Sequence, residues 1–290
     1  MYRIQALFIL LLIAVNTLAW CLPLFACALL RLISPASLHA WCTRRAMNLA
    51  EGWIAVNNFI FRVFDLLQVE LTDHSGLSQD NWYLVISNHQ AWSDIFILQA
   101  VFNRRIPMLK FFIKQILLWV PVIGIAWWVL DFPVMRRYSR EQLERQPALR
   151  TRDQETTRRA CERFKLTPVS VLNFLEGTRF SEAKRERFGS PYRHLLPPKA
   201  GGASVVLAAL SDRLSTIVDV TIQYPDGAPT LMAFLGGRAG RIRVSIREIA
   251  VPADIRFDTY DDNAMTREAA KAWLNEIWLE KDQQLSDGLR

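Results

Sequence analysis

The chain has 290 residues, enough for one sizeable α/β domain and a smaller appendage, and its 51% hydrophobic content and positive mean hydropathy are high for a soluble enzyme, which indicates membrane contact. The formal net charge of +7 favours anionic partners: lipid headgroups, phosphate esters or nucleic acid. Four cysteines without metal-ligand spacing and four dispersed histidines argue against a disulfide framework, a zinc site and a multi-histidine metal centre.

The amino-terminal end of the chain is apolar. Residues 4–30 carry no charge, and because about 20 apolar residues span a bilayer, we expect an uncleaved membrane anchor here. A cleaved signal peptide is the competing interpretation, but the apolar run is too long for one and no clean cleavage site follows it. Basic residues are more frequent after the segment than before it, which favours a cytoplasmic position for the following domain.

Residues 39–71 carry aromatic and aliphatic side chains at helical spacing. This pattern predicts a second helix that lies in the membrane interface or packs on the first, and an ordinary core helix of the following domain is the alternative. Together the two helices would form either a hairpin dipping into one leaflet or a single span with an interfacial helix, and the sequence leaves both open. We assign residues 1–67 to the membrane anchor and residues 68–290 to an α/β domain.

A polar loop, Ser87–Asp94, follows the apolar run at residues 82–86, which predicts a buried strand. Open α/β sheets keep their chemistry in loops at the carboxyl ends of strands. His89 and Asp94 would point about 140° apart on one continuous helix. They meet if the loop turns and Asp94 lies in the first turn of the next helix, where its carboxylate would hold one imidazole nitrogen and leave the other as a base.

The middle of the chain alternates apolar and charged segments. Residues 104–112 predict a strand or connector, and Lys114 then begins an apolar helix containing Gly124. This helix leads into a strand that ends at Arg136 and Arg137. The charged residues that follow, up to position 166, have helical spacing and predict solvated helices.

A second apolar strand, at residues 169–175, ends in Glu176-Gly177-Thr178-Arg179. A His-x4-Asp motif followed at this distance by Glu-Gly-Thr-Arg resembles the glycerolipid acyltransferases, which acylate 1-acylglycerol 3-phosphate and related lysophospholipids. The glycine in an apolar run that leads to a strand ending in arginine is similar to the second block of that family. The resemblance covers residues 82–224, about half of the chain.

The later segments are similar to one branch of the family. Lys199 stands just before a predicted helix start, where outward-pointing amide groups can hold an anion. The strand that follows carries Asp-x-Thr-x-x-Tyr at residues 219–224, which matches the lysophospholipid branch and departs from the Pro-rich fourth block of simpler bacterial members. Residues 236–240 predict a hairpin turn before a strand at 242–249, and residues 264–285 predict an amphipathic helix over one face of the sheet.

The residues and the resemblance together imply a mixed, mostly parallel α/β sheet flanked by helices, with an amino-terminal pair of membrane-anchoring helices. His89 and Asp94 are the expected catalytic base and its partner. Arg179, beside Gly177 and Thr178, is expected to bind the acceptor phosphate, and Glu176 to order that loop. We also expect substrate contacts from Gly124, from Arg136 or Arg137, and from Lys199.

The expected reaction moves a fatty acyl group from acyl-CoA or acyl carrier protein to the free hydroxyl of a lysophospholipid. No Gly-x-Ser-x-Gly turn occurs in the sequence, so the hydroxyl would attack the thioester directly, while the fatty chain occupies an apolar tunnel between sheet and helices. The resemblance implies no metal, no other cofactor and no nucleic acid. We expect the protein in a bacterial inner membrane, with its catalytic domain on the cytoplasmic side.

Two other functions remain as alternatives. A membrane lipid hydrolase would use His89 and Asp94 on water, but the sequence shows neither a nucleophile elbow nor metal-ligand spacing. A non-catalytic adaptor that binds anionic lipid would not need the intact set of His, Asp and Arg.

Overall fold

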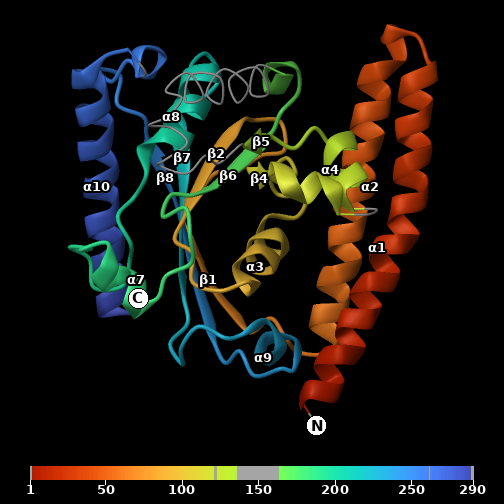
Figure 1. Cartoon of the computed structure of the whole chain (residues 1–290), viewed down its shortest axis with the longest axis horizontal. Coiled ribbons are helices and arrows are strands. Elements are labelled where there is room, and N and C mark those ends of the chain that lie inside the picture. The colour runs from red at the N-terminus through yellow and green to blue at the C-terminus, as the bar shows by residue number, and fades with distance from the viewer. Residues whose placement is uncertain (1, 121–122, 136–162, 261, 289–290) are drawn as a thin grey trace.

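A six-stranded sheet forms the centre of the fold in the computed structural model, which describes residues 2–120, 123–135, 163–260 and 262–288 (Figure 1). The strand order is β1-β8-β7-β2-β6-β3. These strands are β1 (Val69–Asp73), β2 (Tyr83–Ser87), β3 (Leu109–Phe111), β6 (Ser170–Phe174), β7 (Thr216–Gln223) and β8 (Ile242–Ala250). β2 pairs in parallel with both β6 and β7, β6 with β3, and β1 with β8, whereas β7 and β8 are antiparallel. The sheet is therefore mixed and mostly parallel, as predicted.

Both faces of the sheet are covered, which explains the unbroken apolar run in β2. Val85 packs into one apolar layer, and Leu84 and Ile86 pack into the other. The first layer includes α3 (Ser93–Phe102) and α9 (Leu231–Leu235), and the second includes α8 (Ala200–Ala209), η3 (Phe257–Thr259) and α10 (Ala264–Asp287) (Figure 1). The predicted helix at 264–285 thus covers a sheet face.

Two long helices, α1 (Tyr2–Ile33) and α2 (Ala36–Val63), pack on each other beside the sheet domain (Figure 1). By length and composition, α1 is the one helix among the described residues that could cross a membrane. Both of its ends contact the sheet domain. The Arg238 guanidinium lies 4.6 Å from the centre of the Tyr2 ring, and Arg31 forms a 3.2 Å ion pair with Asp131.

The second helix is shorter than the sequence predicts. α2 ends at Val63, and the segment predicted to continue as helix to residue 71 instead contains β1, at the edge of the sheet. Asp65 has a positive φ of 51°, which turns the chain between the two elements. The apolar residues of β1 resemble a continuation of the helix pattern because so short a strand has little periodicity of its own.

The segment after β3 was also predicted incorrectly in part. Lys114 ends a two-residue strand, β4 (Ile113–Lys114), which pairs in parallel with β5 (Val134–Met135). The apolar stretch between them forms η1 (Gln115–Trp119) and the short helix α4 (Ile123–Val129). Of the predicted helices after Arg137, the described part begins at η2 (Arg163–Leu166).

The predicted hairpin turn at residues 236–240 is wrong. β7 and β8 do pair as antiparallel neighbours, but residues 224–241 connect them and include α9, which packs on α1. Phe234 and Leu235 of α9 are buried in the same apolar layer as Ala6 and Ile9 of α1, and this packing stabilises a helix too short to persist alone.

Candidate active site

Three parallel neighbours, β2, β6 and β7, end at the same edge of the sheet. The chain leaves β2 at Ser87, β6 at Phe174 and β7 at Gln223. Because carboxyl ends of parallel strands meet at one edge, the His89 loop, the Glu176–Arg179 turn and Tyr224 are brought together there.

The predicted contact between His89 and Asp94 is present. His89 Nδ1 lies 2.8 Å from Asp94 Oδ2, and that oxygen also accepts the backbone N–H groups of Gln90 at 2.7 Å and Ala91 at 2.9 Å. The Asp94 side chain is 0% exposed and lies in the first turn of α3, where the loop closes around it. A carboxylate accepts and does not donate, so the proton on the imidazole is at Nδ1, and Nε2 is the nitrogen available to a substrate.

The imidazole of His89 is also held by its surroundings. Its ring stacks on Phe174 of β6 with centroids 4.0 Å apart and an interplanar angle of 16°. The preceding residue, Asn88, bridges β2 to β7: its Nδ2 donates to the Ile222 carbonyl at 2.8 Å, and its Oδ1 accepts the Ile222 N–H at 2.9 Å. These two contacts satisfy both polar atoms of the buried amide. The sequence alone did not indicate this role for Asn88.

Glu176 orders the loops and is 1% exposed. Its Oε1 accepts the His89 backbone N–H at 2.9 Å, and its Oε2 accepts the Leu196 N–H at 3.0 Å. Burial raises the pKa of this carboxyl to about 8, although the two amide hydrogen bonds oppose the shift. Because both of its oxygens accept backbone N–H groups, Glu176 links the His89 loop to the loop that contains Leu196.

The turn after Glu176 lies against the His89 loop. The Phe180 N–H donates to the His89 carbonyl at 2.7 Å, and the Arg179 guanidinium lies 4.5 Å from the centre of the Trp92 ring. Lys184, in α7 (Glu182–Arg187), holds the turn by donating to Thr178 Oγ1 and to the Arg179 carbonyl, both at 2.8 Å. The turn is therefore bonded to the His89 loop, and the Arg179 guanidinium lies over Trp92 of that loop.

Gly177 allows a second cation to approach the same turn. Its φ is +66°, a conformation that other residues rarely adopt, and a Cβ atom there would lie 3.1 Å from Lys199 Nζ. Lys199 is thus placed over the turn, and its own N–H donates to the Leu175 carbonyl at 2.8 Å. The structure brings together the predicted residues His89, Asp94, Glu176, Gly177, Thr178, Arg179 and Lys199.

Other predicted site residues lie elsewhere or are not described. Arg136 and Arg137 fall outside the described residues. Gly124 lies in α4, where a Cβ atom would come within 2.0 Å of the Leu118 carbonyl oxygen. A glycine is therefore required for close packing between η1 and α4, and a substrate contact of Gly124 stays a prediction.

Tyr224 is a second site residue whose role the sequence did not reveal. Its hydroxyl lies 2.5 Å from Asp94 Oδ1 and 2.8 Å from Ser93 Oγ. The sequence feature that could have indicated a role for Tyr224 is its place in the Asp-x-Thr-x-x-Tyr pattern at residues 219–224. Asp219 and Thr221 face α10, where both contact Lys281, while Tyr224 packs in the layer of α3.

The Acyltransferase family model matches residues 68–224, from just before β1 to Tyr224. The chain belongs to this family. The match contains every strand that ends at the site, the His89 loop and the Glu176 turn.

Curated relatives are similar to this chain at 24% to 28% identity. The probable 1-acyl-sn-glycerol-3-phosphate acyltransferase 5 of Arabidopsis thaliana is 28% identical over 251 residues, which are 81% of this chain and 61% of the relative. The 1-acyl-sn-glycerol-3-phosphate acyltransferase gamma of Homo sapiens is 27% identical over 69% of this chain and 51% of its own. Lysocardiolipin acyltransferase 1 of Danio rerio is 24% identical over 88% of this chain and 64% of its own. The chain spans between half and two thirds of the length of these relatives.

Among solved structures, the chain is similar to the 1-acyl-sn-glycerophosphate (LPA) acyltransferase PlsC from Thermotoga maritima. The TM-score is 0.45 and the identity 16%, with 91% of this chain and 97% of that chain covered.

In this family member, a large apolar cavity lies between the helix pair and the matched segment. It holds about 290 Å³ and is lined by α1, α2, α3, β3 and α4. Ile95 and Phe96, the residues directly after Asp94, contribute to its wall, opposite Trp20 of α1 and Trp53 of α2.

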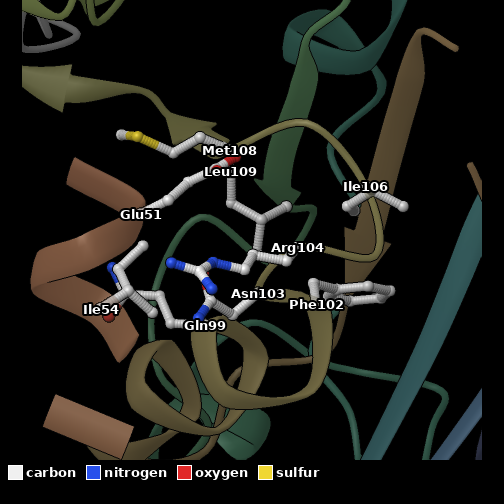
Figure 2. A pocket seen from close by; sticks show the side chains of 9 residues that line it. All are labelled: Glu51, Ile54, Gln99, Phe102, Asn103, Arg104, Ile106, Met108 and Leu109. Carbon is white, nitrogen blue, oxygen red and sulfur yellow. The ribbon is translucent and has the colours of Figure 1, made fainter. Parts of the chain in front are cut away.

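A second, smaller cavity adjoins it and shares Gln99 and Met108 with it. Figure 2 shows Arg104 extending from the chain after α3 toward Glu51 and Ile54 of α2. This cavity holds about 10 Å³, roughly the space of one water molecule, and is therefore too small for a substrate.

No group of three or more potential metal ligands occurs among the residues that the structure describes.

Proposed function

We propose that this protein is a membrane-bound acyltransferase that moves a fatty acyl group from a thioester to the free hydroxyl of 1-acylglycerol 3-phosphate or a related lysophospholipid. The observation that carries the proposal is the oriented His89–Asp94 pair beside the Arg179 turn. Relatives that are named 1-acyl-sn-glycerol-3-phosphate acyltransferases support the acceptor, and acyl-CoA or acyl carrier protein is the proposed donor.

The His89–Asp94 geometry suits direct attack on the thioester. As the acceptor hydroxyl oxygen bonds to the thioester carbonyl carbon, Nε2 of His89 takes the hydroxyl proton, and Asp94 stabilises the resulting imidazolium. The tetrahedral intermediate then collapses, the carbon–sulfur bond breaks, and the imidazolium returns its proton to the departing sulfur. A positioned base of this kind contributes roughly 10² to 10⁴ in rate.

Two cations at the turn that bonds to the His89 loop suit a phosphate on the acceptor. Arg179 offers a planar fork of N–H donors, and its stacking on Trp92 fixes where that fork lies. Lys199 lies over Gly177 of the same turn. A phosphate held by these two groups would place the acceptor hydroxyl beside His89.

The apolar cavity is the proposed site of the fatty chain. Its wall begins at Ile95, next to the catalytic carboxylate, and its other side is formed by the anchor helices. Each methylene buried there contributes about 0.8 kcal/mol, so a chain that fills the cavity is favoured over a shorter one.

The attachment of α1 at both ends favours a hairpin in one leaflet over a single span. An α-helix of 32 residues is about 48 Å long, whereas the hydrocarbon core of a bilayer is about 30 Å thick. If α1 crossed the bilayer, Arg238 and Asp131 would lie on opposite sides of it, although both belong to the sheet domain. The net charge of +7 suits the anionic cytoplasmic leaflet, and a bacterial inner membrane is the proposed location.

A thiol-release assay tests the proposed activity. Membranes containing the protein are supplied with acyl thioesters of several chain lengths and with a panel of lysolipids. A transferase releases thiol when an acceptor is present, and labelled diacyl product forms in equal amount. Equal thiol release without acceptor would indicate a hydrolase, and no release in any combination would leave the proposal without support.

A further inference from the structure

We propose that Tyr224 is a positioning residue that orients Asp94 toward His89 and, together with Ser93, sets how strongly the carboxylate attracts the imidazole proton. The inference rests on the proposed function, because it concerns the base of that reaction. It begins from the second oxygen of the buried carboxylate.

The two oxygens of Asp94 have different partners. Oδ2 is bound by His89 Nδ1 and by two backbone N–H groups, whereas Oδ1 is bound by the hydroxyl of Tyr224 at 2.5 Å. A buried carboxylate oxygen without a donor is destabilising, so this hydroxyl is needed wherever Asp94 is ionised. It also prevents rotation of the carboxylate, because each oxygen has its own fixed donors.

The direction of the hydrogen bonds follows from the chemistry of the three groups. An ionised carboxylate can accept and not donate, so the Tyr224 proton points at Asp94 Oδ1. The Tyr224 oxygen is then the acceptor in its 2.8 Å contact with Ser93, whose hydroxyl donates. Burial raises the pKa of the Tyr224 hydroxyl above its usual range, which keeps that proton in place. A continuous chain of hydrogen bonds therefore runs from Ser93 through Tyr224 to Asp94, and His89 donates to the other oxygen of that carboxylate.

The strand that carries Tyr224 is fixed from its other face. Lys281 of α10 is fully buried and lies 2.6 Å from Asp219 Oδ1, and it donates to Thr221 Oγ1 at 3.0 Å and to the Val220 carbonyl at 2.7 Å. The first two members of the Asp-x-Thr-x-x-Tyr pattern thus hold β7 against α10, and the third reaches across the sheet edge to the catalytic pair.

Tyr224→Phe removes the hydroxyl and leaves the ring. Asp94 then loses one of its donors, so its negative charge is less dispersed and holds the imidazolium more strongly. The base deprotonates at higher pH as a result, and the acid limb of the pH–rate profile moves upward by roughly half a unit to one unit. We expect kcat to fall about tenfold with the acceptor KM unchanged within about twofold. Ser93→Ala should move the limb in the same direction by a smaller amount.

The other charged groups near the pair are unchanged in these variants. They are Glu176, bound to the His89 amide, Arg179 on Trp92, and Lys281, which acts on Glu176 from α10. The matched control is Tyr83→Phe. Tyr83 is buried at the start of β2, where its hydroxyl accepts the Ser78 N–H at 2.8 Å, and its loss should leave kcat and the pH profile unchanged.

The experiment measures kcat, KM and the pH–rate profile of the full-length wild type and the three variants in the same membranes. In parallel, NMR of labelled histidine records the pH midpoint of the His89 ring signal, which needs no turnover. An upward shift of that midpoint in Tyr224→Phe and not in Tyr83→Phe supports the inference even if the wild type lacks transferase activity, in which case the proposed function alone fails. Unchanged midpoints in both Tyr224→Phe and Ser93→Ala, or an equal shift in Tyr83→Phe, would overturn it. If Tyr224→Phe does not fold, the midpoint of the His89 ring signal in Ser93→Ala tests the inference: an upward shift supports it, and an unchanged midpoint overturns it.

Discussion

The edge of the sheet at His89 and the apolar cavity beside α1 differ in how their side chains are held. At the edge, nearly every polar group named above has a partner at 2.5 to 3.0 Å, and the imidazole, carboxylate and guanidinium each have a fixed orientation. In the cavity, side chains from α1, α2, α3 and α4 surround about 290 Å³ by packing contacts. The first region suits chemistry that depends on direction, and the second suits recognition that depends on volume.

This difference predicts two kinds of response to mutation. Loss of the base at the edge should lower the rate for every substrate, and loss of Arg179 should act most on acceptors with a phosphate, because each of these groups contacts one part of the reacting molecules. A change of volume in the cavity should alter which chain is used while the rate for the best chain is retained. The variants below test that division.

The largest effect is expected for His89→Ala. Removal of the base should lower thioester-dependent acylation of lysophosphatidate by roughly 10² to 10⁴, to background, while the protein still reaches the membrane. The control is His74→Ala, an exposed histidine after β1, which runs antiparallel to β2 and therefore ends at the opposite edge. Wild-type turnover in purified His89→Ala would remove the proposed mechanism.

A smaller and more selective effect is expected for Arg179→Ala. A lost hydrogen bond between charged groups should raise the KM for a phosphate-bearing acceptor by about tenfold to a hundredfold, with a smaller rise for acceptors that lack the phosphate. Arg213→Ala is the matched control, since Arg213 also stacks on an indole, 4.9 Å from the Trp82 ring centre, away from the site. An equal loss on both kinds of acceptor would show that Arg179 does not read the phosphate.

The cavity should respond to added volume with altered chain preference. Ala126 of α4 lines it, so Ala126→Phe should lower kcat/KM for long-chain donors by about fourfold for each methylene excluded and leave short-chain donors unaffected. Ile125→Phe enlarges an exposed side chain of the same helix and should leave the preference unchanged. If Ala126→Phe slowed all chain lengths equally, the cavity would not be the chain site.

The sequence identified the His89–Asp94 pair and the Glu176 turn but not Asn88 or the role of Tyr224, and it predicted an apolar tunnel without the residues that line it. His89, Asp94 and the Glu176 turn are local patterns at the ends of strands with strong apolar signatures, so their meeting point follows from parallel strand order. The role of Tyr224 depends on which face of β7 it occupies and on how far β7 extends beside β2, which is information that pairing supplies and composition does not.

The cavity depends on packing between elements that are distant in sequence. Its wall combines Trp20, Trp53, Phe96 and Phe132, from α1, α2, α3 and the chain before β5, and each is individually an ordinary apolar residue. The contacts that hold α1 along the domain are also distant in sequence: Arg238 lies in a loop predicted to be a hairpin turn, and Asp131 lies in the connection between α4 and β5. Tertiary contacts of this kind leave no periodic signal in any single segment.

The last expected effect is on stability and not on rate, and it comes from the pH dependence of Glu176. Its pKa in the folded protein is about 8, above the ordinary value of 4.5, so the folded state binds a proton more tightly than the unfolded state. Stability is therefore highest below about pH 4.5 with respect to this group and decreases as pH rises to about 8, with a limiting slope of about 1.4 kcal/mol per pH unit.

Glu176→Gln removes that titration, so the fall of the thermal midpoint between pH 4.5 and 8 should be shallower than in the wild type. The variant also replaces one acceptor oxygen by an NH₂ group that faces a backbone N–H, so at low pH it should be less stable than the wild type. Glu248→Gln, at an exposed position of β8, is the control and should leave the slope unchanged. If the thermal midpoint fell with pH by the same slope in wild type and Glu176→Gln, the hydrogen bonds between the two loops would not depend on a buried, titrating carboxyl. In that case the edge would be held by packing, as the cavity is.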